Sequence, residues 1–236
     1  MARNHTFAPG TYVHVCNRGV KKMPIRRDES DFWRLLLNFY YFNHAEPLPA
    51  HWKRDLERRG GSARFRWPEE WGEREPLVAI LAFSLMPNHL HLVLKEFVED
   101  GVSRFAHKVL MGYSKFINEK YGESGSLFQG PFRSRIITDD MDFRYLAVYV
   151  MVKNPFELYP GGLKRAIEQF DDAYAFALSS PFNSLADYAG ARASPILDKD
   201  LFGELFETPE SFKEFARECM LDKLDALESI AQELGF

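Results

Sequence analysis

The sequence predicts an α+β fold, in which a ferredoxin-like antiparallel sheet has helices on one face, an added helix that carries a tyrosine, and a C-terminal helical extension. Two observations support this prediction. The chain has 236 residues, 46% hydrophobic and 27% charged, a balance typical of a globular protein with its own core. Hydrophobic periodicity then gives the order strand, helix, strand, strand, helix, strand, helix, which is the ferredoxin-like order with one helix added.

The first part of the chain supplies a strand, a helix and an insertion. Residues 11–16 are β-branched and aromatic and lead into an Asn-Arg-Gly turn, which predicts a strand. Residues 28–43 place apolar side chains at helical spacing behind acidic residues that suit a helix N-terminus, which predicts a helix with one buried face. Residues 45–76 are rich in Pro, Gly, Arg, Glu and Trp without a clean period, and we interpret them as a variable insertion.

The middle of the chain completes the predicted sheet. Residues 77–86 and 89–95 flank a Pro-Asn turn and are predicted to form a hairpin. Residues 102–121 carry an apolar stripe at helical spacing, and residues 132–137 follow a glycine-rich loop as a short strand. A further helix is predicted over residues 140–153, because the Pro at 155 disfavours its continuation.

These elements divide the chain into three parts. Residues 1–159 hold the sheet and the tyrosine-bearing helix, and residues 160–196, where the pattern loosens, are interpreted as a linker or small subdomain. Residues 197–236 form an acidic helical tail with eleven acidic and four basic residues, in which one helix is predicted from Pro209 to about residue 234. We expect removal of this tail to preserve or strengthen affinity for a polyanion.

Charge and composition narrow the class of protein. The net charge is −4, but the tail alone carries −7, so residues 1–196 carry +3 and remain compatible with a nucleic-acid partner. Two cysteines are too few for a disulfide framework and fit a reducing compartment. No apolar run reaches the roughly 20 residues of a membrane span, and the first residues lack a secretory signal pattern. We therefore expect a cytoplasmic protein with no membrane association.

The first candidate site is the pair His89 and His91. In a strand, side chains alternate between faces, so both imidazoles project from one side of the sheet, with α-carbons about 7 Å apart. Leu90, Leu92 and Leu94 then pack the opposite side. Two imidazoles on one face can chelate a divalent ion, although an isolated His-x-His more often belongs to a strand without a ligand. His14 is placed by its strand near the same face, where we interpret it as a structural histidine.

Four sequence blocks in order resemble a known family. They are YVHVCNRG at 12–19, SLMPNHLHLVL at 84–94, GSLFQGPFRS at 125–134 and YVMVKNP at 149–155. Together these blocks resemble the HUH single-tyrosine transposases, in particular the REP-associated tyrosine transposases. The likeness extends over roughly residues 10–160 and is far more specific than the His-x-His motif alone.

The resemblance implies a metal-dependent reaction on single-stranded or hairpin DNA. It implies that His89 and His91 bind the catalytic metal, Mg²⁺ or Mn²⁺, and that a tyrosine oxygen attacks a phosphodiester to give a 5′-phosphotyrosine and a free 3′-hydroxyl. Because the covalent intermediate conserves the bond energy, strand transfer needs no ATP, in agreement with the absence of a phosphate-binding Gly-Lys-Ser/Thr loop. Activity is expected to fall as pH drops through about 6.5, where free imidazole protonates. A homodimer is compatible with the sequence.

The nucleophile implied by the resemblance is Tyr149. In the family this tyrosine commonly lies four residues before an Asn or Gln that helps to hold the metal. Here Asn154 is five residues after Tyr149 and Lys153 is four residues after it, so either could assist. Tyr145, one helical turn earlier, also remains eligible because it differs from Tyr149 by only about 40° in direction.

A DNA-binding segment is predicted at residues 128–135. Phe128 and Phe132 alternate there with Arg133 and Arg135, a pattern that suits stacking on unpaired bases beside phosphate contacts. Aromatic packing with a solvated basic edge would give the same pattern.

Two other functions remain open at this stage. A transposase-derived DNA-binding regulator without catalysis would keep the same sequence blocks but fail in the geometry of the tyrosine. A ferredoxin-like RNA-binding module would share the element order, but no strand has the aromatic pattern typical of such modules.

Overall fold

A four-stranded antiparallel sheet lies at the centre of this computed structural model, which describes residues 7–57 and 65–233. Its strand order is β2-β3-β1-β4. The strands are β1 (Tyr12–Arg18), β2 (Val78–Met86), β3 (His89–Glu96) and β4 (Arg133–Ile136). Helix α1 (Glu29–Tyr41) connects β1 to β2, and α3 (Gly101–Tyr121) connects β3 to β4. This is the ferredoxin-like order, so the predicted α+β fold class is confirmed.

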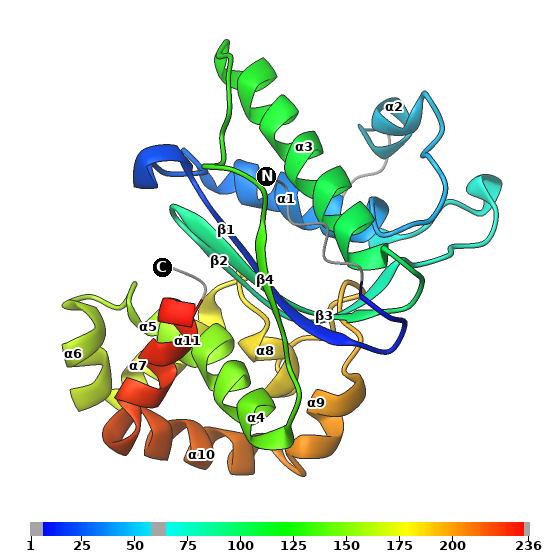
Figure 1. The fold of residues 1–236 in the computed structure, drawn as a ribbon. Coiled ribbons are helices and arrows are strands. Elements are labelled where there is room, and N and C mark those ends of the chain that lie inside the picture. Colours follow the sequence, from blue (N-terminus) through cyan, green and yellow to red (C-terminus); the bar gives the residue numbers. More distant parts are fainter. Residues whose placement is uncertain (1–6, 58–64, 234–236) are drawn as a thin grey trace.

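Helices α1 and α3 cover one face of the sheet (Figure 1). Helix α1 begins at a capping box in which the side chains of Asp28 and Asp31 accept hydrogen bonds from each other's backbone amides. The apolar stripes of both helices pack on the odd-numbered side chains of β1 and on Leu90, Leu92 and Leu94 of β3. This arrangement leaves the even-numbered side chains of β1 and the histidines of β3 on the opposite face.

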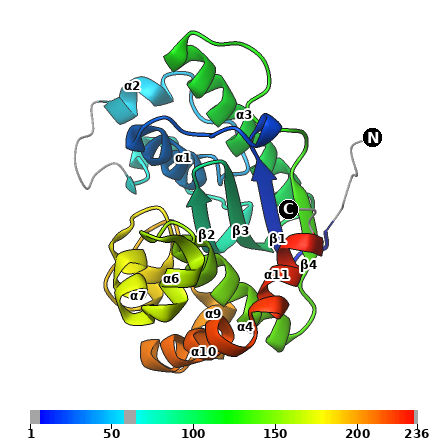
Figure 2. The ribbon, with the colours of Figure 1, turned by 90° about the vertical axis from the view of Figure 1, so that its left-hand side faces the viewer.

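The opposite face is covered by later helices, which Figure 2 shows below the sheet. Helix α4 (Asp140–Val148) continues directly into a π-helical turn, η4 (Tyr149–Lys153), and then into α5 (Asn154–Phe156). The following helices are α6 (Gly162–Glu168), α7 (Phe170–Ser179), α8 (Leu185–Tyr188), α9 (Asp200–Leu205), α10 (Pro209–Asp222) and α11 (Leu224–Glu233). The predicted helix over residues 140–153 therefore exists, but its last turn is wound differently from an α-helix.

The segment after α7 adds a short extension to the outer edge of the sheet. The amide of Leu85 donates to the carbonyl of Phe182, and the amide of Ser184 donates to the carbonyl of Phe83. Asn183 forms an isolated antiparallel bridge with Ser84. The edge of β2 is thus paired rather than open, which satisfies its backbone groups.

The C-terminal region forms two helices rather than the single predicted one. The prediction of one helix from Pro209 to about residue 234 is wrong because Lys223 leaves the helical conformation, with φ −132° and ψ 31°. The chain turns there, and α11 folds back onto α4. Six buried side chains of α10 and α11 belong to the same hydrophobic cluster as α4: Phe212, Ala216, Cys219, Met220, Leu227 and Ile230.

The segment predicted as an insertion contains a short helix, α2 (Trp52–Glu57), and a 3₁₀ turn, η3 (Glu69–Trp71). A second 3₁₀ turn, η1 (Val20–Lys22), follows β1. Just before this segment, the side-chain oxygen of Asn43 accepts from the amides of Leu77 and Val78 and so ties the end of α1 to the start of β2. Within residues 7–57 and 65–233, no helix combines the length and apolarity that crossing a bilayer requires.

Candidate functional site

Three histidines form a buried cluster on the α4 face of the sheet. The Nε2 atom of His14 lies 3.0 Å from Nδ1 of His91, and the rings of His89 and His91 have centroids 5.0 Å apart. His14 and His91 are fully buried and His89 is 8% exposed. The prediction that both imidazoles of the His-x-His motif share one face is confirmed. His14, which the sequence places near this face, is in direct contact with the pair.

Tyr149 packs against these histidines. Its ring centroid is 5.2 Å from that of His91, with the ring planes perpendicular, and 6.2 Å from that of His14. Tyr145 instead stacks on Phe215 of α10, at 6.0 Å between centroids. Of the two tyrosines that the sequence left eligible, the structure brings Tyr149 to the histidine cluster and directs Tyr145 to the C-terminal helices.

The π-helical turn explains the unusual spacing between Tyr149 and Asn154. In η4 the amide of Asn154 donates to the carbonyl of Tyr149, five residues earlier. In an α-helix that bond joins residues four apart, so here five residues complete one turn. Asn154 therefore follows Tyr149 by one turn, as a residue four positions later would in an α-helix. Its side chain is 1% exposed, and its Nδ2 has no hydrogen-bond partner among the described residues.

Burial holds the histidines in the neutral form. It lowers the pKa of His14 to about 3, with a smaller contribution from Arg135. It lowers the pKa of His89 to about 3 as well, where Arg18 and Lys153 add to the effect. The pKa of His91 also lies well below its usual range, because of burial and then of the neighbouring histidines and the same two cations. Neutral imidazoles keep the lone pair that a metal needs.

Burial has the opposite effect on the tyrosine. It raises the pKa of Tyr149, and the nearby Glu157 raises this pKa further. Only 2% of the Tyr149 side chain is exposed. At neutral pH the phenol is therefore protonated, and it loses its proton only if another positive charge or a base stabilises the phenolate.

The histidine pair fits two nitrogen ligands of a divalent metal. The ring nitrogen Nδ1 of His89 donates to Oδ1 of Asn88 at 2.6 Å, so the neutral ring carries its lone pair on Nε2. His91 meets His14 through Nδ1 in the same way, so its Nε2 is the corresponding ligand atom when Nδ1 carries the proton. Among the residues that the structure describes, no group of three or more His, Cys, Asp or Glu is arranged to hold a metal. Any further ligands would come from amide oxygens, substrate or water.

The predicted DNA-binding segment is divided between core and surface. Phe128 is 5% exposed and lies 6.4 Å from Tyr113 between ring centroids, so burial removes the ring from base stacking in this conformation. Phe132 is half-buried, and Arg133 is exposed. Arg135 donates from both terminal nitrogens to the carboxylate of Asp142, each at 2.7 Å, so its charge is already paired. Of the four side chains, Arg133 is the exposed cation and Phe132 is the less buried ring.

This pairing predicts a difference between the two arginines of β4. Arg135→Ala should lower the free energy of unfolding by about 1–3 kcal/mol, because it breaks a partly buried bidentate pair that ties β4 to α4. Arg133→Ala, an exposed change on the same strand, should alter stability by about 0.5 kcal/mol or less. Urea denaturation of both variants measures these values. Equal destabilisation by the two changes would contradict the role assigned to the Asp142 pair.

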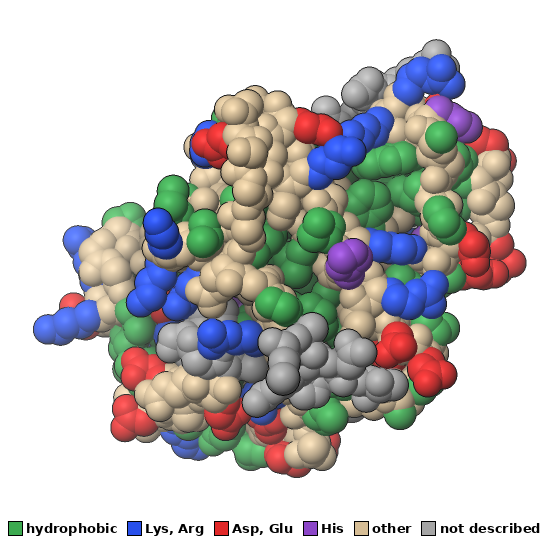
Figure 3. Space-filling view, turned by 45° about the horizontal axis from the view of Figure 1, so that its top comes forward, with side chains coloured by type: hydrophobic (Ala, Val, Ile, Leu, Met, Phe, Trp, Pro, Cys, Tyr) green, Lys and Arg blue, Asp and Glu red, His purple; other side chains and the backbone are tan. Residues whose placement is uncertain are grey.

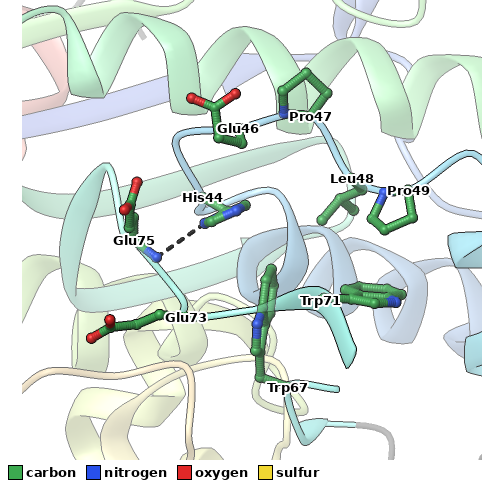
Figure 4. A pocket seen from close by; sticks show the side chains of 9 residues that line it. All are labelled: His44, Glu46, Pro47, Leu48, Pro49, Trp67, Trp71, Glu73 and Glu75. Atoms are coloured by element: carbon green, nitrogen blue, oxygen red, sulfur yellow. Dashed lines mark hydrogen bonds between the residues drawn. The ribbon is translucent and has the colours of Figure 1, made fainter. Parts of the chain in front are cut away.

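Several hollows in the described part of the chain lie away from the histidine cluster. One, of about 470 Å³, lies between α3 and the loop before β4, and its lining includes Asn17, His107 and Phe132. On the face that Figure 3 shows, the Lys and Arg side chains stand in separate groups rather than in one stripe. A second hollow, of about 210 Å³, is lined by Trp67, Trp71 and His44 with three glutamates at its rim (Figure 4).

Comparisons with known proteins give little information about the function of this site. No family model matches the chain, and no curated protein matches it. Among solved structures, the chain is similar to one described as the structure of a REP-associated tyrosine transposase bound to a REP hairpin. The TM-score is 0.43 at 12% identity, over 84% of this chain and 93% of that one. Because this similarity is low, we base the functional proposal on the residues of this chain.

Sequence reasoning missed two charged residues that act on the histidine cluster or on Tyr149. Arg18, at the end of β1, acts electrostatically on His89, His91 and Tyr149. Glu157 forms an ion pair with Lys153. The Lys153–Glu157 pair has a recognisable signal, since opposite charges four residues apart meet on a helix surface. Arg18 has no such signal, because its neighbours come from distant parts of the chain.

Proposed function

We propose that this chain is a metal-dependent enzyme that nicks single-stranded or hairpin DNA and transfers the strand through a 5′-phosphotyrosine, as an HUH single-tyrosine transposase does. The observation that carries the proposal is the contact of Tyr149 with the neutral histidines of the sheet, at 5.2 Å between ring centroids. The four sequence blocks support the choice of DNA as substrate. The basic exposed Arg133 and the half-buried Phe132 give single-stranded DNA a charge and a ring to contact.

In the proposed reaction the oxygen of Tyr149 forms a bond to phosphorus, and the bond from phosphorus to the 3′-oxygen breaks. The phenol loses its proton, and the leaving 3′-oxygen gains one. Attack by another 3′-hydroxyl on the phosphotyrosine reverses these changes and joins the strands. His89 and His91 would hold a Mg²⁺ or Mn²⁺ ion, which neutralises phosphate charge and favours the phenolate. His14 positions His91 through the contact between their ring nitrogens.

Burial of the tyrosine sets a condition on this reaction. The phenol of Tyr149 is 2% exposed and His89 is 8% exposed. A DNA phosphate therefore reaches the phenol only when the side chains that cover it shift. The same burial favours the second candidate function, a catalytically inactive regulator that binds DNA with residues outside the cluster.

A covalent-adduct experiment tests the proposal. The protein is incubated with labelled single-stranded hairpin DNA and Mn²⁺ or Mg²⁺, and the products are separated in SDS. We expect an SDS-stable adduct that EDTA abolishes. Tyr149→Phe should abolish the adduct yet keep DNA binding, because only the oxygen is lost. Tyr145→Phe, one turn away, is the matched control and should keep the adduct.

The outcomes separate the candidate functions. If the adduct survives Tyr149→Phe and disappears with Tyr145→Phe, the nucleophile is Tyr145, one helical turn earlier. Binding without any adduct in the unaltered protein would favour the inactive regulator. Equal affinity for a single-stranded RNA of the same sequence, again without an adduct, would favour the RNA-binding module.

A further inference from the structure

A buried lysine lies beside the proposed nucleophile. Lys153 is 8% exposed, and its Nζ lies 5.4 Å from the centre of the Tyr149 ring. Lysine is rarely buried to this extent unless it is paired. Its partner is Glu157, four residues later, which is itself partly exposed.

The charge of Lys153 also acts electrostatically on the histidines. It disfavours protonation of both His89 and His91, as the charge of Arg18 does. Lys153 comes from η4 and Arg18 comes from the end of β1, so two cations act on the cluster from separate elements. The neutral histidines carry no charge themselves, and Lys153 is paired with Glu157 outside the histidine cluster. Such an arrangement suits an anion whose charge increases during a reaction.

From this placement we infer that Lys153 is a further catalytic residue, whose ammonium contacts the phosphate attacked by Tyr149 and is held by Glu157 when DNA is absent. This inference rests on the proposed function. A phosphate bound at the Tyr149 oxygen would come close to Lys153, because the ammonium lies 5.4 Å from the centre of the same ring. Lysine binds phosphate as a point charge, and no proton transfer from it is required.

The ion pair between Lys153 and Glu157 also affects how tightly DNA binds. The carboxylate of Glu157 competes with a phosphate oxygen for the same ammonium, so DNA binding must displace it. Removal of its charge should therefore strengthen DNA binding, whereas removal of the charge of Lys153 should weaken it. A purely structural ion pair would lose stability in both cases and would show no such opposition.

The test compares four variants. Lys153→Met keeps the buried alkyl chain without the charge, and Lys153→Arg keeps the charge. Glu157→Gln removes the competing charge, and Lys164→Met removes an exposed lysine of α6 as the matched control. Two properties are measured: the rate of adduct formation on single-stranded hairpin DNA with Mn²⁺, and the salt dependence of DNA affinity in the Tyr149→Phe background, where no chemistry occurs.

We expect Lys153→Met to slow adduct formation by about 10²-fold or more, as loss of one transition-state contact does elsewhere. For Lys153→Met, the dependence of DNA affinity on salt concentration should correspond to the release of about one counterion fewer. Lys153→Arg should restore the salt slope, Glu157→Gln should tighten binding, and Lys164→Met should change neither property.

Two results would overturn the inference. One is a rate and salt slope in Lys153→Met equal to those of Lys164→Met. The other is weaker binding in Glu157→Gln. Failure of the proposed function looks different, because then the unaltered protein itself forms no adduct.

Discussion

Removal of residues 207–236 is expected to unfold the protein rather than release a separable acidic tail. Helices α10 and α11 bury Phe212, Met220, Leu227 and Ile230 in the cluster that also holds α4. Each such side chain contributes about 1.5–3 kcal/mol when it leaves water. Their sum is comparable with the whole stability of a typical domain, about 5–15 kcal/mol. Circular dichroism and a thermal melt of the truncated chain measure the loss.

Two neighbouring substitutions on α10 provide a finer version of this experiment. Met220 is 1% exposed, whereas Leu221 is 57% exposed. Met220→Ala should lower the free energy of unfolding by about 2–5 kcal/mol, because it leaves a cavity in the core. Leu221→Ala should change it by about 0.5 kcal/mol or less. A folded truncated chain with stronger DNA affinity would instead agree with the expectation from charge alone.

The path of the chain through α10 and α11 depends on contacts between residues far apart in the sequence. The sequence predicted an acidic amphipathic helix, and the acidic side chains of α10 and α11 are exposed. No glycine or proline marks the break at Lys223, so the sequence predicts one continuous helix. Only the fold shows that α11 turns back onto α4, because the partner stripe on α4 is far away in the sequence.

The sheet and its first helices could be predicted because their signals are local. Alternation in β1 and β3 assigned each side chain to a face, and this assignment alone placed His89 and His91 together. The π turn could not be predicted, since one extra residue in a helix of mostly apolar side chains hardly changes the hydrophobic period. As a result, the spacing of Tyr149 and Asn154 looked irregular in the sequence, although it corresponds to one full turn in the fold.

The roles of Phe128 and Arg135 show a second limit. Aromatic and basic residues in alternation indicate either a DNA surface or a core edge, and the sequence left both open. The structure buries Phe128 beside Tyr113 and pairs Arg135 with Asp142. Both partners lie in other elements, so the choice between the two interpretations depends on tertiary contacts.

Acidification is expected to destabilise the fold strongly between pH 6.5 and about 3. The pKa values of His14 and His89 are about 3 in the folded protein, and that of His91 is also well below 6.5. The unfolded chain therefore binds protons below pH 6.5 that the folded chain does not bind. Stability is fully present above pH 6.5 and is lost as pH falls toward the folded pKa values. Each of these histidines contributes a slope of about 1.4 kcal/mol per pH unit.

Urea denaturation from pH 7.5 to 5 measures this slope, and histidine variants identify its source. His14→Gln removes one buried titrating group and should flatten the dependence by about one third, since three histidines share it. His51→Gln, at an exposed histidine outside the cluster, is the matched control. Parallel slopes in His14→Gln and the unaltered protein would contradict the assignment. Because the folded histidines stay neutral near pH 6, protons do not compete with a metal there. A loss of activity at that pH should therefore accompany unfolding rather than precede it.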